Sequence, residues 1–547
     1  MRTIAYVTAA CLLLAAGTSA CTDISEYNPG GLTSQTVFTT PAGFESLVNA
    51  AYAYQRWWYG KEEAINMTET GTDLFTSGAG DTHPSLTTYQ SLEGSETAVT
   101  QLWGNLYSGI NLVNAGINSI DKAGFSPTQH DTRLAELRFL RAFYYWHVVE
   151  TWGGVHFSLE ETTSAVSTAN KTPVDTFYAQ IFSDLDYAVN HLPKTTTDYG
   201  RVTKGAARAF QARMYLTRGQ NQQAYDAATD VINNYGYKLL TKYSDLWRMD
   251  NLVNSEIVYA VNYSVNTALD DAVNTILFPG GHPRGGNNAH LMFLMIYDKQ
   301  PGMLRDITYG RPFNRYMPTK FLLNLFDPSK DARYEGSFET MWLANGSPLP
   351  AGIKLGDTAV VALKYAVTPE FRASKKYRIY DINDEFNATG VPAQRLYYPP
   401  ISKFMDPTRP SAQEQVSGRD CFVIRLAEMY LDAAEAKLNL GDQATAAQLI
   451  NVVRSRAAVT GKTADMQITP ADVTIDFILD ERAREFAGEQ IRWFDLKRTG
   501  KLVERVTKYN PDAAPWIKAF HTVRPIPQTQ IDAVTNKDEF KQNAGYK

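Results

Sequence analysis

The chain has 547 residues, of which 44% are hydrophobic and 20% charged, a balance typical of globular proteins that bury a large core. Its formal net charge at pH 7 is -5, so the chain lacks the excess of basic residues that nucleic-acid binding needs. The composition therefore indicates a globular protein and excludes nucleic acid as its main partner.

The start of the chain is typical of a secretory signal. Arg2 precedes an apolar run that is too short to span a bilayer, and small residues follow this run. Cys21 comes next, in a pattern that resembles the lipobox of bacterial lipoproteins, where the cysteine becomes the acylated first residue. Thr18 stands where that motif usually has leucine, and ordinary cleavage with an unmodified Cys21 is the alternative. We predict a signal peptide over 1–20 and a lipid-anchored tether over 21–32.

The use of cysteine fits this interpretation. Cys11 leaves with the signal and Cys21 takes the lipid, so Cys421 has no partner for a disulfide within the mature chain. Cys421 opens an apolar segment that we expect to begin a helix. Its thiol is expected to act as a small buried hydrophobe.

Helical periodicity starts after the tether. Apolar residues recur at three and four positions over 33–59, and Pro41 marks the start of the helix. A loop rich in Gly, Ser and Thr follows over 76–93, and a second strong helix is predicted over Arg133–Trp152. The aromatic run 57–59 is compatible either with the core or with a ligand cleft.

Two segments far apart in the sequence predict the same helical hairpin. In each, a helix rich in alanine and leucine ends at a glycine, Gly219 or Gly441, and a second alanine-rich helix follows. The matched positions are Ala212 with Ala434, Leu216 with Leu438, Ala224 with Ala446 and Val231 with Val453. A helix pair of this kind buries its apolar stripe only against a neighbouring pair. The repeat is tetratricopeptide-like and indicates an array of helical hairpins.

Between the two hairpins the pattern changes. Residues 239–420 are dense in glycine, proline and scattered aromatics, with short hydrophobic runs such as 256–261 that predict single strands. Long connections inside a compact protein are usually functional. We therefore predict a mostly α-helical protein, in which a helical scaffold over about 33–238 and 421–547 carries an irregular, loop-rich binding lobe.

Several groups of residues along the chain match one family pattern. They are Ala135–Trp146 with Trp152–Gly154, Gly200–Ala206, Arg425–Ala436, Glu481–Phe486 with Arg492–Arg498, Pro525–Pro527, and Gln542–Asn543 with Gly545–Tyr546. Each is a weak motif alone. Together, in this order behind a lipoprotein signal, they span nearly the whole chain and resemble the SusD/RagB family of outer-membrane lipoproteins of the Bacteroidetes.

The resemblance implies a single SusD-like domain over 33–547, with four tetratricopeptide-like helix pairs and a binding lobe built from insertions. It implies a lipid-anchored protein of the outer membrane that faces outward from the cell and binds nutrients, usually glycans. Its partner would be a TonB-dependent transporter barrel of the SusC type, over which it sits as a lid. The resemblance implies no catalysis and no cofactor.

The residues themselves carry no recognisable enzyme signature. The sequence has no G-x-S-x-G, H-E-x-x-H, phosphate-loop or dinucleotide-binding motif. Glu481 and Glu485, with the arginines between them, are expected to form ion pairs on the helix surface or between helices. Residues 381–385 place oxygen ligands at alternate positions, as calcium loops do, but lack the glycine of the sharp turn. A polar turn is therefore favoured over a metal site.

Sugar binding needs flat aromatic faces together with side chains that hydrogen-bond to hydroxyl groups. Two loop regions, 75–89 and 282–342, supply such mixtures, and the resemblance implies ligand contacts in the same two regions. The predicted ligand-binding residues are Phe75, Asp81, His83, Tyr89, His290, Tyr297, Tyr309, Arg311 and Trp342. Local packing is the alternative for each aromatic.

The sequence is thus interpreted as a cell-surface lipoprotein that captures an oligosaccharide or polysaccharide and delivers it to a transporter barrel. A peptide-binding protein or a pure interaction scaffold of the same fold is the first alternative. A glycoside hydrolase on a helical scaffold is less favoured. The sequence identifies no sugar, linkage or chain length.

Overall fold

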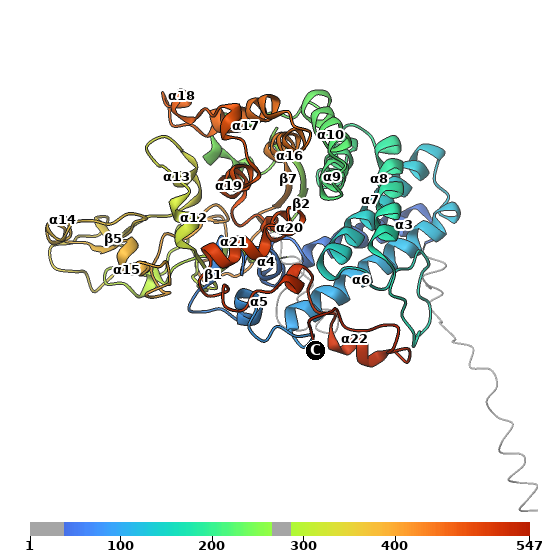
Figure 1. Ribbon diagram of the computed structural model, residues 1–547, viewed down its shortest axis with the longest axis horizontal. Helices are drawn as coiled ribbons and strands as arrows, with labels where there is room; N and C mark the ends of the chain where they lie inside the picture. The colour runs from blue at the N-terminus through green and yellow to red at the C-terminus, as the bar shows by residue number, and fades with distance from the viewer. Residues whose placement is uncertain (1–37, 265–285) are drawn as a thin grey trace, which may run out of the picture.

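The computed structural model describes residues 38–264 and 286–547. The predicted signal peptide, the predicted tether and Cys21 lie outside these residues. Within them the protein is mostly α-helical, and no helix there combines the length and the apolar character that crossing a membrane demands. The helices form a broad body, and a lobe of loops and short strands projects from one side of it (Figure 1).

The helical body comes from both ends of the described chain. The N-terminal part contributes α3 (Pro41–Ala53), α4 (Glu62–Thr68), α5 (Pro84–Thr88), α6 (Thr97–Ser119), α7 (Pro127–Trp152), α8 (Val174–His191), α9 (Lys204–Thr217) and α10 (Asn221–Asn234). The C-terminal part contributes α16 (Leu426–Asn439), α17 (Gln443–Ala457), α18 (Thr463–Met466), α19 (Ile475–Phe486), α20 (Arg492–Arg498), α21 (Leu502–Tyr509) and α22 (Gln528–Ala533). Buried side chains from both parts join in one hydrophobic core.

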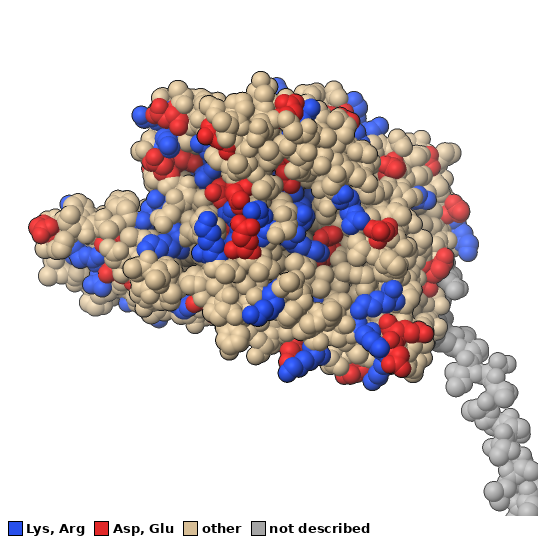
Figure 2. Space-filling model, viewed as in Figure 1, with Lys and Arg blue, Asp and Glu red and all other residues tan. Residues whose placement is uncertain are grey.

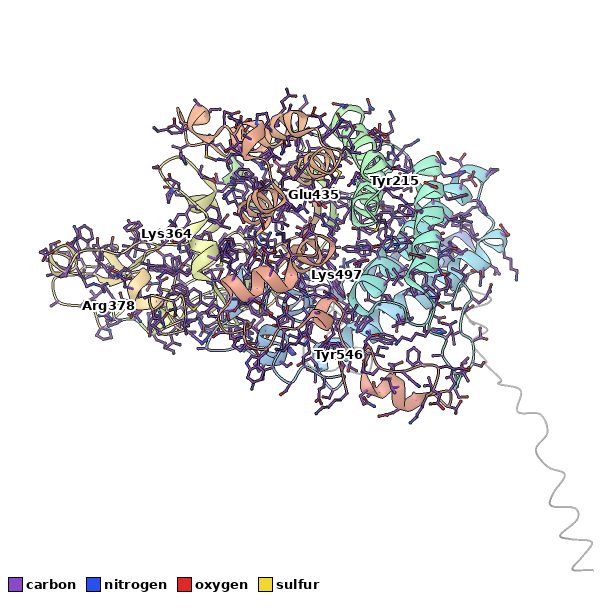
Figure 3. The ribbon with its side chains drawn as sticks, viewed as in Figure 1. Tyr215, Lys364, Arg378, Glu435, Lys497 and Tyr546 are labelled. Carbon is purple, nitrogen blue, oxygen red and sulfur yellow. The ribbon has the colours of Figure 1, made fainter. Side chains whose placement is uncertain are left out.

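The lobe lies between these two parts in the sequence. Its elements are α11 (Ala289–Met292), β3 (Tyr316–Pro318), α12 (Lys320–Asn324), α13 (Arg333–Ser337), β4 (Met341–Leu343), β5 (Thr358–Ala362), α14 (Pro369–Ala373), β6 (Arg378–Tyr380) and α15 (Ile382–Glu385). In its sheet, β5 runs antiparallel to β4 and parallel to β6. The lobe has a core of its own. Figure 3 places Lys364 and Arg378 on the lobe, and Glu435 and Lys497 in the helical body.

Local signals explain where the long N-terminal helices begin. Thr40 caps α3, because its hydroxyl accepts a hydrogen bond from the Gly43 amide at 3.2 Å. Helix α7 begins at Pro127, six residues before the predicted start, because Ser126 and Gln129 form a capping box there. Its predicted end at Trp152 is confirmed.

The two predicted hairpins are confirmed as α9–α10 and α16–α17, in a tetratricopeptide-like arrangement. Gly219 and Gly441 follow the first helix of each pair with φ of +70° and +82°, a conformation that side chains disfavour. Asp442 caps α17 by accepting from the Thr445 amide at 3.0 Å. Helix α16 packs against both α9 and α10, so the two copies lie side by side.

The segment from Cys421 to Arg425 is a strand, and the prediction that a helix begins at Cys421 is wrong. This strand, β7 (Cys421–Arg425), pairs antiparallel with β2 (Ile257–Val261), the strand predicted over 256–261. Its aromatic and β-branched residues favour an extended conformation. Cys421 is half-buried, and burial raises the pKa of its thiol, so it stays protonated.

A buried ionic network ties the lobe to the helical body. Glu481 on α19 pairs with Arg333 of α13 at 2.8 Å and with Arg454 of α17 at 2.7 Å. Glu485 pairs with Arg333 at 3.1 Å and with Arg425 at 3.0 Å. Burial alone would raise the pKa of Glu481, but the guanidiniums, Arg333 foremost, hold it well below its usual range. The ion pairs of both glutamates are thus buried. They join α19 to α13, α17 and β7, and Glu481 also pairs with Arg484 within α19.

The aromatic run 57–59 belongs to the core. The side chains of Trp57, Trp58 and Tyr59 are 4%, 1% and 3% exposed. Tyr59 bonds to His147 of α7 at 3.2 Å, and Trp58 packs edge-on against the same imidazole. This run therefore anchors the N-terminal part to α7 and offers no face to a ligand.

Positive and negative side chains are interspersed over the face shown in Figure 2. This mixture agrees with the small formal net charge of -5. No broad surface of one sign dominates this face. On this face, charged side chains therefore act through local arrangements and not through one broad field.

Candidate functional site

The fold brings together the two loop regions in which ligand-binding residues were predicted. Strand β1 (Phe75–Ser77) pairs antiparallel with β3, so that Phe75 lies opposite Pro318 and Ser77 opposite Tyr316. The segment 78–83 continues from β1, and the segment 309–315 leads into β3. We call these two segments, together with Glu62 beneath them, the junction surface.

Close backbone approach fixes the two segments against each other. The amide of Gly78 donates to the Arg315 carbonyl at 2.8 Å, and the amide of Gly80 donates to the Asn314 carbonyl at 2.9 Å. A Cβ atom on either glycine would lie 2.2 Å from a backbone oxygen of the facing segment. Glycine is therefore required at both positions, because only a bare backbone can approach so closely.

Three alternate residues form the exposed face of the second segment. Arg311, Phe313 and Arg315 are half-buried, whereas the residues between them are buried. The guanidinium carbons of Arg311 and Arg315 lie 5.3 Å and 5.0 Å from the centre of the Phe313 ring. Cation–π attraction holds the ring between two groups that carry several hydrogen-bond donors. The result is a half-buried aromatic ring with hydrogen-bond donors beside it.

Acidic and hydroxyl groups border this face. Arg315 pairs with Glu62 through Nε and Oε1 at 2.7 Å, and the Thr82 hydroxyl donates to the same carboxylate oxygen at 2.5 Å. Arg395 donates to the Ser77 carbonyl at 2.6 Å and ties the neighbouring lobe segment to β1. Hydrogen-bond donors and acceptors thus lie close to the Phe313 ring.

His83 and Asp81 hold the first segment in shape. The Asp81 carboxylate accepts from the Ser77 hydroxyl at 2.7 Å and from the His83 amide at 2.9 Å. The His83 Nδ1 atom lies 2.7 Å from Glu96 Oε1. Burial works to lower the pKa of His83, but the bond to Glu96 outweighs it and the pKa is raised. The pKa of Glu96 falls to about 2, because the bonds from His83 and Ser85 outweigh its burial.

Five of the nine predicted ligand-binding residues are buried by other parts of the protein. These are Phe75, Tyr89, His290, Tyr297 and Trp342, with exposed fractions of 0%, 2%, 2%, 1% and 1%. In this conformation they pack the cores, and a ligand could reach them only if covering residues moved. Asp81, His83, Tyr309 and Arg311 are half-buried and border the junction surface. Contact with a ligand remains a prediction for these four.

Tyr309 connects the junction surface to the buried aromatics below it. Its hydroxyl accepts a hydrogen bond from the Leu343 amide at 2.9 Å, and its ring centre lies 5.5 Å from that of Tyr297. Tyr297 in turn stacks on Trp342 at 6.5 Å. His290 is buried elsewhere in the lobe core, and burial lowers its pKa to about 3, so its ring is neutral. These residues support the surface from within.

Phe313, Arg315 and Glu62 were not among the predicted ligand-binding residues. Phe313 and Arg315 lie within the predicted region 282–342, and their spacing from Arg311 is the signal that could have identified them. Residues at alternate positions of an extended segment share a face. Glu62 lies in a helix far away in the sequence, and only the fold brings it to this surface.

The predicted calcium-like segment is a helix start. Asp381 caps α15 by accepting from the amides of Asn383 and Asp384, and it pairs with Arg372 at 2.8 Å. Among the residues that the structure describes, no group of three or more His, Cys, Asp or Glu side chains has an arrangement that could hold a metal ion. The Asp381 carboxylate is committed to backbone amides and a guanidinium.

The chemistry of the junction surface suits binding of a neutral, hydroxyl-rich molecule. A flat aromatic ring offers a face to the C–H side of a sugar ring. Guanidinium, carboxylate and hydroxyl groups around it can hydrogen-bond to sugar hydroxyls.

Comparison with known proteins shows which family the chain resembles. A family model described as the SusD family matches residues 285–546, which include the lobe and the C-terminal helices. A second model, described as starch-binding and associating with the outer membrane, matches residues 34–216. Together the two models cover most of the chain.

Individual relatives agree with the family models. A SusD-like protein, P25, of Formosa agariphila is 25% identical over 82% of this chain and 80% of its own length. The starch-binding protein SusD of Bacteroides thetaiotaomicron is 26% identical over 84% of this chain and 80% of its own. A solved structure of a laminarin-binding SusD-like protein covers 93% of this chain and 100% of its own, with 23% identity and a TM-score of 0.71. This last likeness bears on the fold alone.

Proposed function

Because the chain belongs to the SusD family, we propose that it captures a neutral oligosaccharide at the junction surface and passes it to a partner transporter. The observation that carries this proposal is the meeting of the two predicted ligand regions at β1 and β3. There, the half-buried ring of Phe313 lies beside the guanidiniums of Arg311 and Arg315. The relative described as a starch-binding protein supports a glycan as the ligand.

Binding without chemical change is the activity that we propose. The junction surface offers hydrogen-bond partners and one aromatic face. Glu62 is engaged with Arg315 and Thr82, and Asp81 with Ser77 and the His83 amide. Carboxylates that are committed in this way are poorly placed to protonate or attack a glycosidic bond. Release of new reducing ends from a bound glycan would contradict this part of the proposal.

The N-terminal sequence and the family support a proposal for the location and the partner of the protein. One matching model describes association with the outer membrane. We propose that acylated Cys21 anchors the chain there on the outer surface of the cell, and that a TonB-dependent barrel of the SusC type receives the glycan. Recovery of the Cys21→Ser chain in the membrane fraction would contradict the anchor. Failure of any barrel to co-purify with the full chain would contradict the transporter.

The direct test removes the aromatic face. Phe313→Ala should weaken the binding of neutral oligosaccharides from starch, laminarin or xyloglucan about tenfold or more, because loss of an aromatic contact worth about 1.4 kcal/mol changes affinity tenfold. Isothermal titration calorimetry of the full chain measures this change. The thermal unfolding midpoint shows whether the variant remains folded.

Phe371→Ala is the matched control. Phe371 lies on α14, is 43% exposed and has the Lys375 amine over its ring at 4.5 Å, but it is not part of the junction surface. Its replacement should leave affinity unchanged. If Phe313→Ala binds as tightly as the unaltered chain, or if both variants lose the same affinity, the junction surface is not the binding site.

A further inference from the structure

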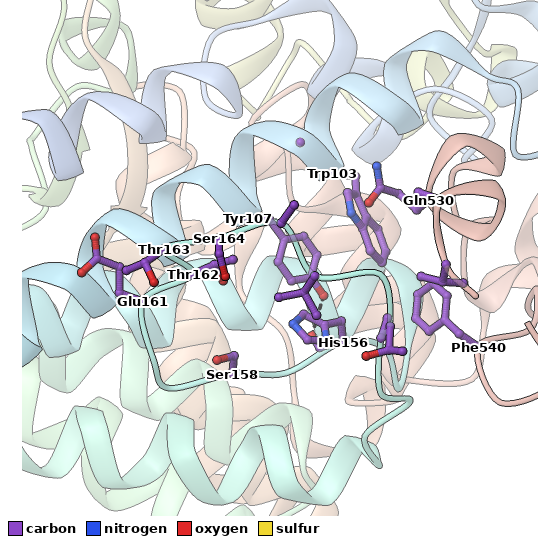
Figure 4. A pocket seen from close by; sticks show the side chains of 17 residues that line it. Trp103, Tyr107, His156, Ser158, Glu161, Thr162, Thr163, Ser164, Gln530 and Phe540 are labelled. Atoms are coloured by element: carbon purple, nitrogen blue, oxygen red, sulfur yellow. Dashed lines mark hydrogen bonds between the residues drawn. The ribbon is translucent and has the colours of Figure 1, made fainter. Parts of the chain in front are cut away.

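A separate groove lies between the helical body and the C-terminal segment. It has a volume of about 570 Å³, within the range of about 300–1,000 Å³ that is usual for small-molecule sites. Trp103 and Tyr107 of α6 form one wall, the loop that carries His156 and Ser158 forms the second, and Phe540 helps to form the third (Figure 4). None of its lining residues belongs to the junction surface.

The groove is preformed, because its loop is fastened on both sides. On the α6 side, Asn114 donates to the Ser158 carbonyl at 2.9 Å. On the C-terminal side, the Thr535 amide donates to the Ser167 carbonyl at 2.8 Å, and the Asn536 side chain donates to the Ala169 carbonyl at 2.8 Å. A loop anchored at both ends cannot collapse into the groove without breaking these bonds. Binding would therefore need little ordering of the walls.

A glycine in the middle of α6 keeps the floor of the groove open. Gly104 lies within this 23-residue helix, where glycine lowers helix stability relative to alanine. The other glycines of the helix are explained by packing: a Cβ on Gly109 would lie 3.1 Å from Tyr144, and one on Gly116 would lie 2.7 Å from Leu47. A Cβ on Gly104 would meet nothing within 4 Å. The bare position instead leaves space in the groove that it lines.

The lining favours a neutral ligand that carries hydroxyl groups. Trp103, Tyr107 and Phe540 supply aromatic surface, whereas serine, threonine and glutamine side chains supply hydrogen-bonding groups. Glu161 is the one charged side chain among the residues that line the groove in the described part of the chain. Burial lowers the pKa of His156, so its ring is neutral at neutral pH. An anionic ligand would find no cation here, and a purely apolar one would leave the polar groups unpaired.

The groove continues along α6. A second cavity of about 280 Å³ continues it along α6 as far as Asn114 and Tyr145. The two cavities share Gly104, Tyr107, His156, Ser158 and Thr162 in their linings. The shared residues of α6 and Asn111 recur at three and four positions, so one face of the helix floors both cavities.

We propose that this groove, lined by α6, the loop 156–169 and the segment 530–540, is a second saccharide-binding site that takes a neutral, linear oligosaccharide. It would hold a part of the glycan apart from the junction surface, or a second glycan. Two sites on one chain raise the overall avidity for a polymeric ligand when both can be engaged at once. The inference stands on the groove itself and does not depend on binding at the junction surface.

Filling the groove from Gly104 tests the proposal. The probes are neutral, linear oligosaccharides from starch and laminarin, and native mass spectrometry counts the copies bound to the full chain. We expect two copies on the unaltered chain and on Gly104→Ala, whose methyl group occupies open space. Gly104→Leu and Gly104→Trp should lose one copy, with at least about tenfold weaker binding at that site. Unchanged unfolding midpoints confirm that these variants fold.

Phe313→Ala separates the two sites. If a copy is lost in Gly104→Trp and kept in Phe313→Ala, the groove binds saccharide, whatever happens at the junction surface. The groove proposal is wrong if the unaltered chain binds a single copy, if Phe313→Ala loses that copy, and if Gly104→Trp binds it as tightly as the unaltered chain. In that case the proposal for the junction surface stands. If no oligosaccharide of the panel binds the unaltered chain, both proposals are wrong.

Discussion

The residues around the junction surface divide into those that can face a ligand and those that shape the loop. Phe313 and its flanking arginines are half-buried and belong to the first group. Asp81 and His83 shape the loop, because their polar atoms are engaged with Ser77 and Glu96, and their contact with a ligand stays a prediction. Substitution of a shaping residue would weaken binding indirectly, through the loop. A loss of affinity in such a variant therefore does not identify a ligand contact.

The His83–Glu96 pair predicts a pH dependence of stability. The pKa of His83 is raised in the folded state, so the stability it contributes is fully present below its unfolded pKa of about 6.5 and is lost as pH rises through the higher folded value. The unfolding midpoint of His83→Asn should therefore fall furthest below that of the unaltered chain near about pH 6, and the gap should narrow by about pH 9.

Glu96 acts in the opposite pH window. Its folded pKa of about 2 lies below the ordinary value, so its contribution is present above about pH 4.5 and is lost only as pH falls toward 2. The contribution of Glu96 to stability therefore does not change between pH 6 and 9. The narrowing of the gap between the two unfolding midpoints in this range comes from His83. A gap between the two chains that stays constant over this range would show that the imidazole is not charged in the fold.

The sequence could not decide whether Trp342 packs in a core or contacts a ligand. A tryptophan in a loop-rich region could pack or could stack on a sugar, and both uses need the same side chain. The structure places it in the lobe core at 1% exposure, on a strand of three residues that is too short to reveal a period. Trp342→Ala would leave a cavity at a cost of about 3–5 kcal/mol, so lost binding in that variant would report unfolding.

The helical hairpins could be predicted from sequence because their signals are local. Glycine at the turn, an aspartate cap and apolar residues at helical spacing all lie within one hairpin, as in α16–α17. Strand β7 was missed because its five residues precede α16 directly and its partner β2 lies far away in the sequence. Pairing between distant strands leaves little trace in either strand alone.

A buried ion pair joins the two hairpins and can be tested. Arg213 of α9 bonds to both carboxylate oxygens of Glu428 on α16, at 2.7 Å and 2.8 Å. Arg213→Met should lower the free energy of unfolding by about 3–5 kcal/mol, because the Glu428 charge is left buried and unpaired. Urea unfolding followed by circular dichroism measures the change.

The double variant Arg213→Met with Glu428→Leu is the control for this prediction. It removes both charges, so it should recover much of the stability that the single variant loses. Equal losses in the single and double variants would show that packing of the arginine stem, and not the ion pair, stabilises the contact between the hairpins.

In the whole molecule, the scaffold and the lobe have separate cores that meet at a charged interface. Arg333 of the lobe is fully buried against α19, and Phe75 from the N-terminal part inserts into the lobe core. The family pattern predicted both parts, and the loop composition predicted which segments carry binding residues, which stays a prediction. The contact of β1 with β3, which assembles the junction surface, could not be predicted, because it joins segments that are distant in sequence and only three residues long.

The helical array supports the surface on which we propose that the glycan binds. Its hairpins fix the ends of the lobe through β2, β7 and the ionic network. The proposed contacts with glycan lie on segments that this scaffold holds together. Binding residues on loops that are positioned by a rigid scaffold are common in proteins.

Hydrogen exchange of the full chain, with and without a saturating neutral oligosaccharide, tests the central claim most directly. Capture at the junction surface predicts slower amide exchange over 78–83 and 309–315 when the glycan is bound, with unchanged exchange over the α16–α17 hairpin. If a glycan binds while both junction segments exchange as fast as in the free chain, the account of where this protein captures its ligand is wrong.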